Sequence, residues 1–151
     1  MAGFWMVRAG EQGYLFDDFV KANAVAIGFA GDVDLTPAKT KADVRTLVLK
    51  TRPSTGTNGM AVLMKFRCTL AVGDGVITYN PLTRQYLIGK IIGDYAFKAG
   101  VVKDHAHFRS VAWRQPISRD ALSPPRIKVE VKHRPRTPIG APEIRSFIGG
   151  L

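Results

Sequence analysis

The chain has 151 residues, of which 46% are hydrophobic and 23% are charged, and these values are typical of one globular domain with a substantial core. A formal net charge of +10 favours nucleic acid as the partner, because phosphates offer dense negative charge. The single cysteine excludes an internal disulfide and a cysteine-based zinc site, and no apolar run reaches the roughly 20 residues of a membrane span. Since the N-terminus has no basic segment followed by an apolar one, we expect a reducing, cytoplasmic setting.

Positive charge is spread over the whole chain. Residues 1–123 hold 16 Lys/Arg against 10 Asp/Glu, a net charge of +6, and residues 124–151 hold 6 against 2, a net charge of +4. Five of the nine prolines lie in the second segment, where apolar residues are too sparse to form a core. We therefore expect a folded domain over residues 1–123 and a basic, Pro-rich tail or linker over residues 124–151.

Hydrophobic periodicity predicts strands and helices in the first half of the chain. Residues 4–8 are rich in aromatic and β-branched side chains and predict a strand, and residues 24–29 predict a second strand, ending in Gly28 and Phe29. Apolar side chains recur on one helical face in three further segments, which predicts helices over residues 14–22, 39–49 and 59–71.

Residues 73–97 supply a central hairpin. Residues 76–80 alternate with a period of two, and residues 86–92, which include three β-branched isoleucines, predict the return strand, with Pro81 suited to the turn between them. The corner that follows, residues 93–97, combines a glycine, a carboxylate and two aromatic rings at a strand end. A sheet protein can build a small pocket at such a corner.

The chain then passes through a predicted loop over residues 98–107 into a last strand over residues 108–114. Alternation in that strand divides its side chains between two faces. Arg109, Val111 and Trp113 share one face, and Phe108, Ser110, Ala112 and Arg114 share the other.

Two groups of potential metal ligands fall short of a metal site. Asp32 and Asp34 resemble the start of a calcium loop but lack its twelve-residue frame and closing glutamate. His105 and His107 lie on one side of an extended segment beside Asp104, but the sequence offers no third cluster of strong ligands. We therefore expect no metal and no other cofactor.

The sequence lacks the common catalytic motifs. It contains no Gly-x-Ser-x-Gly elbow, no His-Glu-x-x-His pair and no dinucleotide fingerprint. Glu130 and Lys132 form a nuclease-like Glu-x-Lys pair, but the pair lies in the tail without a preceding carboxylate partner. The residues alone predict a basic, mixed α/β binding module, and we do not predict an enzyme.

Three stretches taken together resemble a known family. Residues 4–11, 25–29 and 86–95 resemble, in order and spacing, the N-terminal domain of modification-dependent (Mrr-like) restriction endonucleases. That domain is similar to the EVE and YTH members of the PUA-like superfamily. The resemblance covers about residues 4–122 and implies an α+β fold, a curved mixed β-barrel of five or six strands flanked by helices.

The resemblance also implies a function, which is to hold a flipped, modified base between aromatic faces. Phe29 matches the cage position that ends the second strand, where relatives often have Trp, and Tyr95 and Phe97 match the region that supplies another wall. Gly28 allows close approach of a ligand, and Asp94 is placed to accept a hydrogen bond from an exocyclic amine. The alternatives are core packing for the aromatic rings and a turn-capping role for the carboxylate.

Five basic residues are candidate contacts to the nucleic-acid backbone, with a solvated surface charge as the alternative for each: Arg8, Lys90, Lys98, Arg109 and Arg114. The leading hypothesis is the specificity domain of a restriction system, which binds duplex DNA at a modified base while a nuclease domain or subunit acts in trans. N6-methyladenine, 5-methylcytosine and hydroxymethylcytosine all remain open as the modified base. The alternatives are an RNA-binding PUA-like module and an endonuclease built on Glu130 and Lys132.

Overall fold

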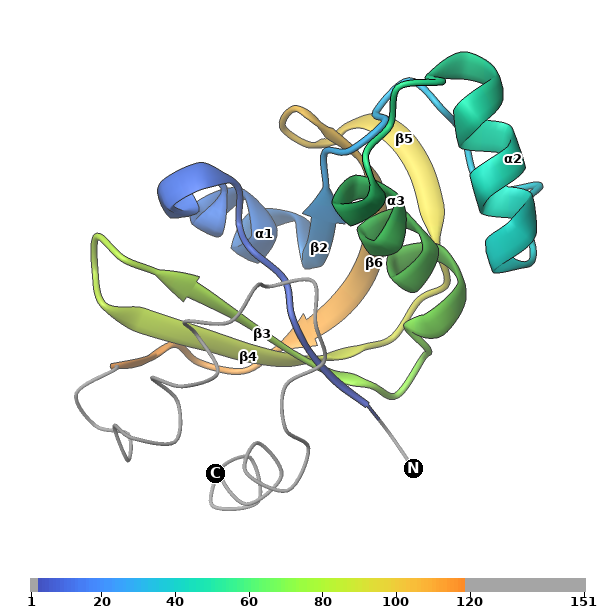
Figure 1. Ribbon diagram of the computed structural model, residues 1–151. Coiled ribbons are helices and arrows are strands. Elements are labelled where there is room, and N and C mark those ends of the chain that lie inside the picture. Colours follow the sequence, from blue (N-terminus) through green and yellow to red (C-terminus); the bar gives the residue numbers. More distant parts are fainter. Residues whose placement is uncertain (1–2, 119–151) are drawn as a thin grey trace.

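The computed structural model describes residues 3–118, which form a strongly curled sheet with helices packed against it (Figure 1). The elements follow one another as β1 (Phe4–Met6), the 3-10 turn η1 (Glu11–Gly13), α1 (Phe16–Ala22), β2 (Ala24–Ile27), α2 (Lys41–Thr51), α3 (Thr57–Met64), the π-helical turn η2 (Lys65–Thr69), β3 (Gly75–Asn80), β4 (Gln85–Ile91), β5 (Ala96–Val102), β6 (His105–Trp113) and β7 (Ile117–Ser118). None of the helices in this part of the chain is long and apolar enough to cross a membrane.

The sheet is mixed, and its strands run in the order β1-β3-β4-β6-β2. β1 pairs with β3 in parallel, and the other pairs are antiparallel, including β5 on β6 and the two-residue β7 on β4. β6 bends the sheet, because its end pairs with β4 through Val111 while its middle pairs with β2 and β5 through His107. β1 and β2 therefore lie at the two ends of the strand order, and the curled sheet forms a half-barrel.

The core lies inside this curl. Among its fully buried members are Phe19 of α1, Val25 of β2, Leu63 of α3 and Val111 of β6. α2 packs against α3 and η2 at the edge of the molecule (Figure 1). A capping box begins α2, in which the Thr40 hydroxyl accepts from the Asp43 backbone N–H at 3.1 Å and the Asp43 carboxylate accepts from the Thr40 N–H at 3.2 Å.

The predicted α+β class with a curved mixed sheet is confirmed, and the assignment to the PUA-like superfamily stays a prediction. The three helices lie near the predicted positions, although the third ends at Met64 and continues as the π-helical turn η2. The predicted loop over residues 98–107 is wrong, because β5 and β6 form a hairpin there, which turns at Asp104 with a φ of 61°. The tail over residues 124–151, with Glu130 and Lys132, lies outside the described residues.

Candidate functional site

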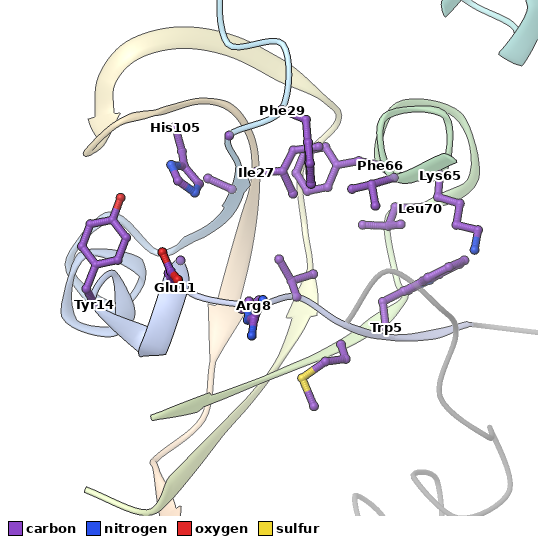
Figure 2. Close-up of a pocket in the computed structure, with 16 residues that line it drawn as sticks. Trp5, Arg8, Glu11, Tyr14, Ile27, Phe29, Lys65, Phe66, Leu70 and His105 are labelled. Carbon is purple, nitrogen blue, oxygen red and sulfur yellow. The ribbon is translucent and has the colours of Figure 1, made fainter. Parts of the chain in front are cut away.

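A cavity of about 490 Å³ lies at the seam between β1 and β2. No backbone pairing joins these two strands in the described part of the chain, so the half-barrel is open at this seam. The wall is completed by η1, α3, η2 and the start of β6 (Figure 2), and comprises Trp5, Met6, Val7, Arg8, Gly10, Glu11, Tyr14, Ala26, Ile27, Gly28, Phe29, Val62, Lys65, Phe66, Leu70 and His105. The volume is within the range of small-molecule and cofactor pockets.

Aromatic side chains form much of the wall. Trp5 and Phe66 are buried, whereas Phe29 is 50% exposed. The Trp5 indole N–H donates to the Asp74 carboxylate at 3.0 Å, and that carboxylate also accepts the backbone N–H groups of Gly3 and Ala71. The indole is therefore held in one orientation.

Phe29 is the second residue after β2, and its ring lies against the first turn of α3. A Cβ atom added at Gly59 would lie 3.2 Å from the Phe29 ring, which shows how closely the ring approaches this turn of α3. Figure 2 places the Phe29 and Phe66 rings on one side of the cavity and Arg8 and Trp5 on the other. The arrangement leaves apolar faces turned toward a space that is open to solvent on one side.

Charged and polar groups accompany these rings. Arg8 and Glu11 are exposed, and Lys65 is half-buried. The Tyr14 hydroxyl donates to the Asp104 carboxylate at 3.2 Å and so joins the start of α1 to the β5–β6 turn. Partial burial, followed by the neighbouring Asp104, raises the pKa of the Tyr14 hydroxyl, so this group stays a neutral donor at physiological pH.

The structure brings only two of the five predicted pocket residues into this cavity. Gly28 and Phe29 line it, whereas Asp94, Tyr95 and Phe97 do not. Tyr95 is only 9% exposed, and Phe97 is half-buried with its ring edge-on to His107 at a centroid distance of 5.2 Å. The prediction needs correction because β5 pairs with β6 directly after the 93–97 corner, which directs Tyr95 into the core.

Tyr95 belongs instead to a buried hydrogen-bond chain. His107 Nε2 lies 2.9 Å from the Ala30 carbonyl oxygen, an acceptor, so this nitrogen carries the ring proton and Nδ1 is an acceptor. The Tyr95 hydroxyl then donates to His107 Nδ1 at 2.6 Å and accepts from the Leu35 backbone N–H at 3.1 Å. Burial raises the pKa of Tyr95 to about 12, and it lowers the pKa of His107. Both ring nitrogens of His107 are used by protein groups, and the chain fixes the loop after β2 on the sheet.

The buried hydrogen bonds of His107 predict how the stability of the protein depends on pH. Because the pKa of His107 in the folded protein lies below its ordinary value of 6.5, the unfolded chain binds the additional proton. The free energy of unfolding is therefore highest above pH 6.5 and falls on acidification, by at most about 1.4 kcal/mol per pH unit, until the folded-state pKa is passed. Urea unfolding at about pH 7.5 and about pH 5.5 measures the change, and His107→Gln should remove most of it. An equal pH dependence in that variant would contradict the assignment.

The five predicted backbone contacts divide into two groups. Arg8, Lys90, Lys98 and Arg114 are exposed, and of these only Arg8 lines the cavity. Arg109 is only 2% exposed, and its guanidinium donates to the carbonyl oxygens of Gly93 at 2.9 Å, Phe66 at 3.3 Å and Leu70 at 2.8 Å. We therefore correct its role to a structural one.

Of the wall residues, the sequence predicts only Arg8, Gly28 and Phe29 as site residues, and it misses Trp5, Phe66 and His105 among others. Trp5 lies in the predicted first strand and Phe66 on a predicted apolar helix face, and neither pattern distinguishes a cavity wall from the core. The alternation that puts His105 and His107 on one side of an extended segment is the available signal for His105, but from sequence this pattern indicates only potential metal ligands.

Comparison with protein families gives one match. The model of a domain of unknown function (DUF8426) matches residues 5–132, which include the whole cavity wall. No curated protein and no solved structure matches the chain at a significant level.

Proposed function

We propose that this chain, which belongs to the DUF8426 family, is a nucleic-acid-binding module that receives one extruded base in the cavity between β1 and β2. The observation that carries the proposal is the aromatic wall at an open seam, with Phe29 half-exposed beside the buried Trp5 and Phe66. A base must leave the stack before a protein can surround it. Stacking on an aromatic side chain is worth about 1–3 kcal/mol per base.

Charge supports the same class of ligand. The chain carries a net charge of +10, and the cavity wall includes Arg8 and Lys65 against the single acidic residue Glu11. Cationic side chains next to an apolar cavity suit a ligand that has a planar apolar body and an attached phosphate. A neutral apolar metabolite would gain nothing from these cations.

The fold and the sequence resemblance narrow the proposal. A curled mixed sheet with three helices is compatible with a PUA-like barrel, and the resemblance is to the N-terminal domain of modification-dependent restriction endonucleases. We therefore propose a reader of a modified base in duplex DNA, which serves a restriction system whose nuclease acts in trans. In the proposed cage, Trp5 and Phe66 stand with Phe29 in place of the Tyr95 and Phe97 expected from sequence, because these two rings line the cavity.

A binding panel tests this function. The probes are matched DNA duplexes and RNA strands that carry N6-methyladenine, 5-methylcytosine, hydroxymethylcytosine or no modification, each measured at several salt concentrations. We expect one modified duplex to bind most tightly and log affinity to fall linearly with log salt. Arg8→Gln should reduce that slope by about one. Preference for an RNA strand would favour the RNA-binding alternative, and equal affinity for modified and unmodified probes would overturn the proposal.

A further inference from the structure

The residue that follows Phe29 has a backbone conformation that non-glycine residues rarely adopt. The φ angle of Ala30 is 47°, which lies in the left-handed region, where a Cβ atom is unfavourable. Such a residue persists only where the surrounding structure holds it, and strain of this kind concentrates at ligand-binding sites. The direction in which the chain presents the Phe29 ring therefore depends on the contacts that hold Ala30.

The carbonyl oxygen of Ala30 accepts two hydrogen bonds. The Val33 backbone N–H donates to it at 3.0 Å and closes the turn over residues 30–33, and His107 Nε2 donates to it at 2.9 Å. His107 belongs to β6, and the Tyr95 hydroxyl at 2.6 Å from its Nδ1 fixes the orientation of its ring. The pairing of β2 with β6, in which Ile27 is opposite His107, brings this ring next to the turn. The sheet thus holds the strained residue through a side chain of β6.

His107 itself is out of reach of a ligand. Its exposed fraction is 0%, and it does not line the cavity. Phe29, in contrast, is half-exposed and lines the cavity (Figure 2). Any effect of His107 on a ligand must therefore pass through the turn that carries Phe29.

The far end of the same loop is held separately. Arg67 of η2 donates to the carbonyl oxygens of Leu35 at 2.9 Å and Thr36 at 3.0 Å. Leu35 is also buried. Loss of the bond between His107 and Ala30 should therefore release the end of the loop that carries the aromatic ring and leave the rest in place.

We propose that His107 is a positioning residue for the cavity, whose bond to the Ala30 carbonyl keeps the Phe29 ring in place as a stacking face. This inference rests on the proposed function and names the residue that orders one wall of its cavity. A ring that is already ordered loses less side-chain freedom when a base stacks on it, so binding costs less. Loss of the bond should weaken stacking although every atom that contacts the base is still present.

Two substitutions of His107 separate its two hydrogen bonds. His107→Gln puts an amide group near the position of Nε2, so it still donates to the Ala30 carbonyl but no longer accepts from Tyr95. His107→Asn puts an amide group near the position of Nδ1, so it keeps the Tyr95 bond and loses the Ala30 bond. Each variant loses one buried hydrogen bond and should melt roughly 2–8 °C below the parent. His107→Gln should keep the preference for the modified duplex, and His107→Asn should reduce it about tenfold.

The placement of the Phe29 ring is measured without nucleic acid. When 4-fluorophenylalanine replaces Phe29, fluorine NMR should give the parent and His107→Gln the same chemical shift and His107→Asn a different one. Ala30→Pro is an independent variant, because proline fixes φ at about −65° and so excludes the value of 47° at this position. It should change the fluorine shift and the preference as His107→Asn does, and thermal melting confirms that each variant is folded.

The outcomes distinguish this inference from the proposed function. A fluorine shift equal to that of the parent in folded His107→Asn or Ala30→Pro overturns the positioning role, whether or not the chain binds DNA. A loss of preference in His107→Gln as large as in His107→Asn overturns it too, because the role of His107 is then a structural one. A parent chain that prefers no modified duplex overturns the proposed function, and the fluorine shifts still decide whether His107 places the ring.

Discussion

Replacing Arg109 by methionine should destabilise the protein by about 3–5 kcal/mol. The guanidinium is buried and donates to three carbonyl oxygens, those of Gly93, Phe66 and Leu70. Phe66 lies within the single turn η2 and Leu70 directly follows it, and in such a short turn these backbone acceptors lack helical partners, so a cation is favourable there. Methionine fills a similar volume but leaves these buried acceptors unpaired.

Thermal unfolding measures the effect, and we expect the melting temperature to fall by roughly 6–20 °C. Arg114→Met is the matched control, because Arg114 follows the same strand but is exposed, and it should change stability by about 0.5 kcal/mol at most. Arg109→Lys keeps the charge without the planar fork and should lie between the two. A melting temperature of Arg109→Met equal to that of the control would show that the guanidinium does not support the fold.

The position of Arg109 illustrates what the sequence could predict. Alternation in the last strand puts it on one face with Val111 and Trp113, and these two are buried and half-buried in the structure. That pattern already indicates an inward-facing arginine. The sequence nevertheless predicts that Arg109 contacts phosphate, because arginine side chains are normally exposed. The sequence does not indicate which carbonyl groups a buried arginine would contact.

Local patterns predicted the elements better than the site. Helix periodicity and strand alternation depend on neighbouring residues, so most helices and strands were found near their true positions. The cavity depends on how close β1 and β2 lie, although they are the two ends of the strand order, and on η2, whose residues complete the wall. The residues next to Trp5 or Phe66 in the sequence do not indicate that β1 and β2 lie close together.

The 93–97 corner shows the same limit for a single residue. An aromatic ring that follows a strand and a glycine can lie either in a cleft or in the core. For Tyr95, the pairing of β5 with β6 determines that the ring lies in the core. Tyr95 turned inward, where Leu35 and His107 satisfy its hydroxyl. Phe29, in a similar setting after β2, stayed half-exposed beside the cavity.

Phe29 provides the most direct test of the site. Because its ring is 50% exposed, Phe29→Ala should cost about 1 kcal/mol of stability and leave the chain folded. The same change removes one stacking face from the cavity, so affinity for the preferred modified duplex should fall about tenfold to a hundredfold, with little change for unmodified DNA. Tyr95→Ala, in contrast, should act through stability, because it empties part of the core and leaves Leu35 N–H and His107 Nδ1 unpaired.

Leu82→Ala is the matched control for Phe29→Ala, since Leu82 is 85% exposed in the β3–β4 turn and does not line the cavity. Direct binding assays on the three variants, each with a thermal melt, separate loss of the site from loss of the fold. The proposed site requires that Phe29→Ala melt close to the parent and lose the preference for modified DNA, while Leu82→Ala keeps both. If folded Phe29→Ala distinguishes modified from unmodified duplex as well as the parent does, the base is not held between β1 and β2.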